Sequence, residues 1–267
     1  MGNGYQQSYQ PDTTAATGSQ VDVGDPAYDQ ARGNAAAIDS MTGSAAGGSD
    51  ILQTASGGNR TPATYMKSIE QVLKGSSTGA EALQYVQKNK IGLLIRSGQS
   101  VEMRADVSSG RVQILLNLDH PPQEAAAYFV HEVNHVREFQ AGTSMVPETA
   151  PGEETYVDHM VREEANGTAL AIRALIETDS TQLKVPRTTL PGEWQYRNAY
   201  SMTIEAGQSP DEAHDVAAEH LFTIYRYTMD APPGKHHPKT MKQFLNYGQY
   251  YRWEYNDTLS KKAASSP

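Results

Sequence analysis

The most constraining feature of the sequence is the segment 125–142 (AAAYFVHEVNHVREFQAG), in which imidazole and charged side chains interrupt an apolar helical pattern. Apolar residues such as Phe129 recur at helical spacing and predict that one face of the segment is buried. His131, Glu132 and His135 stand inside this pattern, where an unpartnered imidazole or carboxylate is costly to bury. The segment therefore predicts a packed helix whose polar cluster requires a partner, for which a metal ion is the best candidate.

The spacing His-Glu-x-x-His suits one particular kind of chemistry. At 3.6 residues per turn, His131 and His135 project from the same helix face one turn apart and can share one zinc ion. Glu132 lies one step round the helix, where it can take a proton from a zinc-bound water. Zinc lowers the pKa of such a water toward about 7 and polarises the carbonyl under attack. The spacing thus predicts a zinc site with Glu132 as the catalytic base.

A catalytic zinc site of this kind needs a third protein ligand. Ala141 occupies the position where a metzincin would carry a third histidine, so that class is excluded. The helix predicted over residues 154–176 offers Glu163 and Glu164 instead. On a helical wheel with about 100° per residue, Glu164 falls on the core-facing side and Glu163 on the side of His159. We therefore expect Glu164 to be the third ligand and keep Glu163 as the second choice.

Other polar residues are candidates for supporting roles. Asn166 and Asp158, on the same predicted helix, can orient a metal-bound imidazole through a hydrogen bond. Stabilising the charge that develops on a carbonyl oxygen requires a donor opposite the metal, typically a Tyr, His or Arg side chain. Tyr200 and His214, in the helices that follow, are candidates for this donor.

The motif HEVNH followed by a helical EEANGTA resembles the gluzincin metallopeptidases, and most closely the small bacterial metallopeptidase domains of toxin and effector proteins. The resemblance covers roughly residues 90–180. It implies a zincin-like fold, zinc held by His131, His135 and a downstream glutamate, and a peptidase whose general base is Glu132. Related families place the ligand glutamate three residues before an Ala-Asn pair, where this chain has Arg162, so the third ligand stays open between the two glutamates.

Two other functional classes remain open. The spacing Glu132-x-x-His135 also occurs in di-iron carboxylate proteins, which need a second Glu-x-x-His motif, and this chain offers Asp211-x-x-His214 in its place. A non-catalytic interaction protein with a degenerate zincin fold would keep the helices and lose the metal. The zinc and iron content of the purified protein separates these classes.

The pattern along the chain predicts an α+β domain over residues 61–260. Three strand-like segments (IGLLIR, SVEMRADV and RVQILLNL) are expected to form a small antiparallel sheet packed on the His-Glu-x-x-His helix. The part that follows is mainly helical and ends in a helix predicted over residues 239–257. Thr61 and Ser209, each followed by proline, predict helix N-caps. Residues 1–60, rich in Gly, Ser, Thr, Ala and Gln, predict a disordered tail.

Composition limits the partners. Lys and Arg total 22 against 31 Asp and Glu, a net charge of −9, which argues against nucleic-acid binding, and no apolar run predicts a membrane span. The chain has no cysteine, so disulfides and thiolate ligands are excluded. No signal peptide is apparent at the N-terminus. Together with the tail and the resemblance, these features favour a bacterial effector secreted without a signal peptide, and otherwise a cytoplasmic protein. Its expected partners are a protein or peptide substrate and a secretion carrier or immunity protein.

Overall fold

The structure is a computed structural model of the 267-residue chain. It describes residues 51–53, 61–98, 102–106, 111–180, 190–228, 237, 240, 242 and 244–265, all within one compact unit, Ala45–Pro267. The elements, in chain order, are β1 (Ile51–Gln53), α2 (Pro62–Leu73), α3 (Ser77–Asn89), β2 (Gly92–Arg96), β3 (Glu102–Asp106), β4 (Arg111–Asn117), α4 (Pro122–Ala141), α5 (Glu153–Ser180), α6 (Glu193–Glu205), α7 (Pro210–Tyr227) and α8 (Tyr247–Ser265).

The strands form a mixed sheet in the order β1-β2-β4-β3. β3 and β4 pair antiparallel, with Met103 opposite Ile114, as expected of a hairpin. β2 pairs parallel with β4, with Leu94 opposite Leu115, so the prediction of an antiparallel sheet is wrong for this strand. β4 buries the consecutive residues Ile114, Leu115 and Leu116. Side chains on both faces of β4 are therefore covered, which is typical of a central strand, and β4 lies between β2 and β3 in the sheet.

β1 lies within the segment 1–60 that the sequence assigns to a disordered tail. It pairs parallel with β2, and Leu52 stands opposite Leu94. Parallel neighbours need a long crossover connection, which α2 and α3 provide because they lie between these two strands in the sequence. The three residues of β1 are therefore an exception to the predicted tail. The rest of that segment lies outside the described residues.

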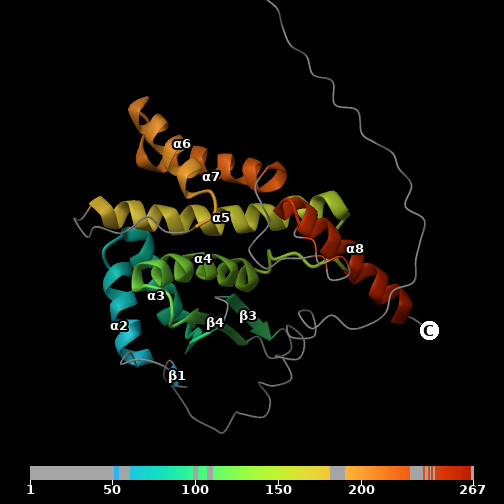
Figure 1. Ribbon diagram of the computed structural model, residues 1–267, viewed down its shortest axis with the longest axis horizontal. Helices are drawn as coiled ribbons and strands as arrows, with labels where there is room; N and C mark the ends of the chain where they lie inside the picture. Colours follow the sequence, from blue (N-terminus) through green and yellow to red (C-terminus); the bar gives the residue numbers. More distant parts are fainter. Residues whose placement is uncertain are drawn as a thin grey trace, which may run out of the picture. The chain divides into compact units, whose positions relative to one another are not determined.

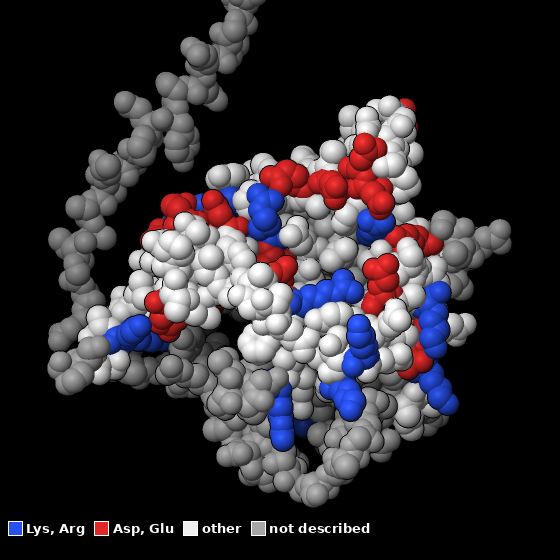
Figure 2. Space-filling model, turned by 180° about the vertical axis from the view of Figure 1, so that it is seen from behind, with Lys and Arg blue, Asp and Glu red and all other residues white. Residues whose placement is uncertain are grey.

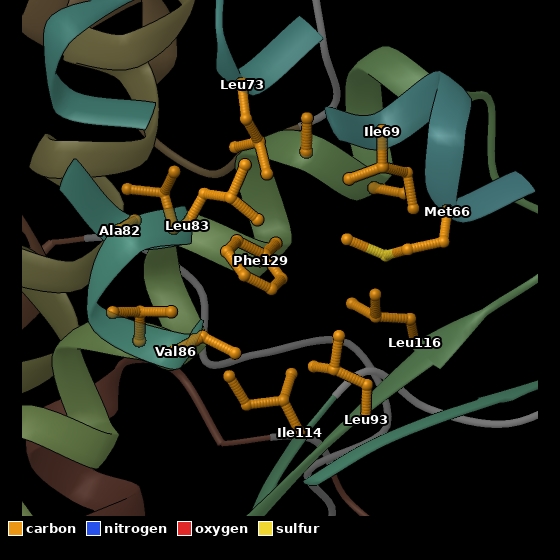
Figure 3. Close-up of a cluster of buried hydrophobic side chains, with 14 of the residues drawn as sticks. Met66, Ile69, Leu73, Ala82, Leu83, Val86, Leu93, Ile114, Leu116 and Phe129 are labelled. Atoms are coloured by element: carbon orange, nitrogen blue, oxygen red, sulfur yellow. The ribbon is translucent and has the colours of Figure 1, made fainter. Parts of the chain in front are cut away.

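α4 closes the first hydrophobic core. Its Phe129 is fully buried among side chains of α2, α3 and the sheet, including Leu83 and Ile114 (Figure 3). The helix ends at Gly142, whose φ of 69° is a left-handed conformation that glycine adopts without strain. Because this core takes one side of α4, the other side is free to face α5.

α5 is the longest helix, with 28 residues, and it organises the second core. It lies between α4 on one side and the α6–α7 pair on the other, while α8 crosses it (Figure 1). Small buried residues such as Ala165 and Ala169 alternate along it with larger ones such as Val161 and Ile172. A helix that is apolar on several sides is covered on several sides, which matches this central position.

Helix boundaries follow the local chemistry. Thr61 and Ser209 cap α2 and α7 through capping boxes, as predicted. The final helix begins at Tyr247 and not near residue 239, because Asn246 Oδ1 accepts a hydrogen bond from the backbone N–H of Gln249 at 2.8 Å and caps it there. It runs on to Ser265. The described elements together give an α+β fold in which helices dominate.

Charged side chains of both signs lie close together on the face shown in Figure 2. Several arginines are ion-paired, for example Arg162 with Glu219 and Arg173 with Asp211, each at 2.6 Å. Within the described residues, no helix combines the length and the apolar character needed to cross a membrane.

Candidate metal centre

Two imidazoles meet on the face of α4 that is turned toward α5. Nε2 of His131 lies 3.0 Å from Nε2 of His135, one helical turn away. The side chains are 14% and 13% exposed, so both are largely buried but can still be reached from solvent. The predicted pair of ligands is therefore brought together with the same ring nitrogen of each directed inward.

α5 adds a carboxylate to this pair. Glu164 Oε2 lies 3.4 Å from His131 Nε2, and Glu164 Oε1 lies 4.0 Å from His135 Nε2. Zinc bonds of about 2.0–2.1 Å at a tetrahedral angle place two ligand atoms about 3.3 Å apart. Among the residues that the structure describes, these three form the one group of metal-ligating side chains with all ligand atoms within 4.8 Å. The observed spacings fit a single divalent cation.

The neighbouring Glu163 has a different place. Its Oε1 lies 2.6 Å from Nδ1 of His135, on the outer side of that ring, and its Oε2 lies 3.7 Å from Nε2 of His159. The helical wheel places Glu163 beside His159 correctly. It is wrong about burial, because the side chain of Glu163 is 5% exposed and that of Glu164 is 19% exposed. Glu163 is thus positioned to support a ligand, and Glu164 to be one.

Each ring also has a polar neighbour at its Nδ1 atom, on the side away from the other ring. A carboxylate such as Glu163 can only accept, so Nδ1 of His135 donates to it. Nδ1 of His131 lies 3.3 Å from the hydroxyl oxygen of Thr168, and that oxygen accepts a hydrogen bond from the hydroxyl of Tyr225. Two Nε2 atoms only 3.0 Å apart need a proton or a metal ion between them, because two bare lone pairs would repel at this distance. This pairing favours a cation at the centre.

The charges around the site reinforce this preference. Burial lowers the pKa of His135, but the hydrogen bond to Glu163 and the charges of Glu164 and Glu132 outweigh burial and raise the pKa to about 9. Burial raises the pKa of Glu164, but hydrogen bonding to His131 and the charge of His135 lower it to about 2. Three carboxylates therefore surround a position that binds positive charge.

Glycine at position 167 allows α5 to approach the site closely. A Cβ atom built on Gly167 would lie 3.0 Å from Nδ1 of His131, which is tighter than nearly all real contacts. Glycine in the middle of a helix is unfavourable by about 1 kcal/mol relative to alanine, so its presence needs a packing reason. The imidazole of His131 supplies that reason.

Glu132 is buried beside the two histidines. It follows His131 on α4 and is 7% exposed. Its charge is one of those that raise the pKa of His135, which indicates that its carboxylate lies close to the site. The position is compatible with the predicted role of a base next to a metal-bound water.

In the part of the chain that it describes, the structure shows no hydrogen bond between the three ligands and the predicted supporting residues, which are Asp158, Asn166, Tyr200 and His214. Asp158 accepts from Nε of Arg226 at 2.6 Å, and within the described part of the chain no hydrogen bond joins Asn166 to the three ligands. Tyr200 stacks on Tyr196 with ring centroids 6.1 Å apart. The carboxylate of Asp158 is thus bound by an arginine, and the described residues show no hydrogen bond from it to His131 or His135.

His214 belongs to a different cluster. Its Nδ1 lies 2.6 Å from the hydroxyl of Tyr196, and the charge of Arg173 helps lower its pKa after burial. Arg173 is nine residues beyond Glu164 on α5, about 13 Å along the helix axis at 1.5 Å per residue. The contact that the structure gives for His214 is thus with Tyr196, and among the described residues no hydrogen bond joins it to the three ligands.

Three supporting residues were missed by the sequence reasoning. Thr168 faces His131, Gly167 admits its ring, and Tyr251 of α8 donates a hydrogen bond to Glu164 Oε1 at 2.6 Å. The glycine inside a helical pattern was a usable signal of close approach. Nothing local to Tyr251 marks it, because it lies 87 residues from its acceptor.

The residues present fit a bound zinc ion. Two imidazole nitrogens and one carboxylate oxygen converge, and each ligand has a hydrogen-bonding neighbour on its outer side. Comparisons of the chain with models of known protein families, with curated proteins and with solved structures give no match. The case for a metal centre therefore rests on the side chains of the chain itself.

Proposed function

We propose that this protein is a zinc-dependent metallohydrolase that cleaves peptide bonds, with His131, His135 and Glu164 as ligands and Glu132 as general base. The observation that carries the proposal is the convergence of the three ligand atoms within 4.8 Å beside a buried glutamate. Two imidazoles and one carboxylate leave one coordination position for water or substrate, which is the ligand set of hydrolytic zinc sites.

The residues around the site have separate roles in the proposed reaction. A bound zinc ion supplies a water of lowered pKa and polarises the substrate carbonyl. Glu132 accepts the proton of the attacking water and then donates it to the leaving amine. Glu163 and Thr168 hold the rings of His135 and His131 so that Nε2 of each stays directed inward. The residual exposure of the ligands allows a substrate to reach the site.

The same contacts support a zincin-like arrangement over the alternatives. A sheet precedes the His-Glu-x-x-His helix, and the next helix supplies the carboxylate, in the order that the resemblance implies. A di-iron site would need a second set of ligands, but Asp211 pairs with Arg173 and His214 bonds to Tyr196. Export as a bacterial effector, with a carrier or immunity partner, remains part of the proposal and rests on the resemblance and on composition.

The test compares wild-type protein with Glu132→Gln and His135→Ala. We expect about one equivalent of zinc in the wild type and in Glu132→Gln, and little in His135→Ala. A proteome-derived peptide library, incubated with each protein and analysed by mass spectrometry, should show new termini only with the wild type. Full activity of Glu132→Gln would contradict the base role. Zinc well below one equivalent in reconstituted wild-type protein would instead favour a non-catalytic interaction protein.

A further inference from the structure

The C-terminal helix α8 reaches the metal site through one side chain, Tyr251. We propose that Tyr251 is a positioning residue, whose hydroxyl holds the carboxylate of Glu164 in the orientation that binds metal. The inference rests on the proposed zinc site. It adds that the site is completed by α8, whose Tyr251 lies 87 residues beyond Glu164 in the sequence.

The two oxygens of Glu164 have different neighbours. Oε1 accepts the hydrogen bond from Tyr251 at 2.6 Å and lies 4.0 Å from Nε2 of His135, whereas Oε2 lies 3.4 Å from Nε2 of His131. One oxygen is therefore fixed by α8, and the other faces the imidazole that shares the cation. A metal-ligating carboxylate held in this way has fewer orientations to lose on binding.

The hydroxyl of Tyr251 is well placed to remain a donor. The residue is 5% exposed, and its ring lies edge-on to that of Tyr156, with centroids 6.3 Å apart. A carboxylate can only accept, so the phenol hydroxyl is the donor of this hydrogen bond.

Ion pairs fix α8 on α5 next to Tyr251. Arg252 Nε lies 2.7 Å from Glu153 Oε1, and a second nitrogen of the same guanidinium bonds to Glu154. Asn256 Nδ2 donates to the other oxygen of Glu153 at 2.7 Å. Arg252 and Asn256 thus connect α8 to the start of α5 on the same helix that carries Tyr251. The tyrosine is held by the fold before any metal binds.

Tyr156 provides a matched control. It is 2% exposed, and its hydroxyl donates to Glu254 Oε2 at 2.6 Å across the same α5–α8 interface. Tyr251→Phe and Tyr156→Phe therefore each remove one hydrogen bond of the same length between a buried tyrosine hydroxyl and a glutamate. They differ in that only the acceptor of Tyr251 is a proposed metal ligand.

The experiment measures zinc affinity by competition with a chromogenic chelator, and the visible spectrum of the Co²⁺-substituted protein, for the wild type and both variants. We expect Tyr251→Phe to weaken zinc binding about 10- to 100-fold and to shift the Co²⁺ absorption bands. Tyr156→Phe should keep the wild-type affinity and spectrum. Thermal unfolding of the metal-free proteins should show a similar small loss of stability in both variants, because each loses one buried hydrogen bond.

The outcomes separate this inference from the proposed function. Wild-type protein that binds zinc, together with an unchanged affinity and Co²⁺ spectrum in Tyr251→Phe, would overturn the positioning role and leave the hydrolase proposal standing. An equal loss of affinity in Tyr156→Phe would also overturn it, since the effect would then come from loosening the interface. Wild-type protein that fails to bind zinc would overturn both.

Discussion

Nδ1 of His135 lies 2.6 Å from Oε1 of Glu163, so the carboxylate sets which nitrogen of the ring faces the metal site. The next residue, Glu164, lies on the opposite side of that ring, near its Nε2. Two consecutive glutamates therefore contact opposite sides of one imidazole, and we propose that Glu163 orients a ligand while Glu164 is itself a ligand.

Substitution of the two glutamates should give different metal-binding phenotypes. We expect Glu164→Gln to bring zinc content well below one equivalent, because the carboxylate that completes the ligand set is lost. Glu163→Gln should retain about one equivalent at saturation but bind it about 10- to 100-fold more weakly, because the orienting charge is lost. Metal analysis together with chelator competition measures both quantities. The reverse order of effects would assign the ligand to Glu163.

Gly167→Ala should weaken metal binding while leaving the helix intact. The added methyl group would press on the ring of His131, from 3.0 Å, and turn its Nε2 away from the site. We expect a loss of zinc affinity of about tenfold or more. Alanine is more favourable than glycine in a helix by up to about 1 kcal/mol, so the metal-free protein can keep its stability while its zinc affinity falls. Gly152→Ala is the control, because its Cβ would meet nothing within 4 Å; equal affinities for the two variants would refute the close-approach argument.

Glu177 should stabilise the fold without affecting the metal. Its carboxylate accepts hydrogen bonds from the backbone N–H of Thr78 at 2.8 Å and from the hydroxyl of Ser77 at 2.9 Å, and it pairs with Arg173. We expect Glu177→Gln to lower the free energy of unfolding by about 1–3 kcal/mol near neutral pH. Urea unfolding monitored by circular dichroism measures this loss, and zinc content should stay at the wild-type value.

The stabilisation by Glu177 should depend on pH in a defined direction. Burial raises its pKa, but the hydrogen bonds from Thr78, Arg173 and Ser77 outweigh burial and lower the pKa from 4.5. A carboxyl whose folded-state pKa is lowered contributes stability above its unfolded value, and this contribution is lost as the pH falls through the folded value. The difference between wild type and Glu177→Gln should therefore be largest above about pH 4.5 and shrink in more acidic solution. A constant difference across this range would contradict the ionic contribution.

The parts of the fold that depend on local chemistry could be predicted. The capping residues Thr61 and Ser209 mark helix starts, and the glycine at 142 marks the end of α4. The parallel pairing of β2 with β4 could not, because strand order depends on which neighbour covers the buried run of β4, and that is a tertiary choice. The start of α8 differs from the prediction because Asn246 acts as an N-cap and not as a residue inside the helix.

The same division applies to the site. The spacing of His131 and His135 places both side chains on one helix face, and the structure brings their Nε2 atoms to 3.0 Å. Helical periodicity favours Glu164 over Glu163 and the structure brings Glu164 to the two imidazoles, but Glu163 is the more buried of the two glutamates. Tyr251 could not be found in this way, because its contact with Glu164 depends on how α8 docks on α5. Periodicity shows which face of a helix a residue occupies but does not identify its distant partner.

The central claim is that one divalent cation lies between three side chains, and an anomalous difference map at the zinc absorption edge tests it most directly. Crystals grown with zinc should show one strong peak about 2.0–2.2 Å from Nε2 of His131, Nε2 of His135 and a carboxylate oxygen of Glu164. A map with no peak among these three side chains, or with the zinc bound elsewhere on the protein, would contradict the account.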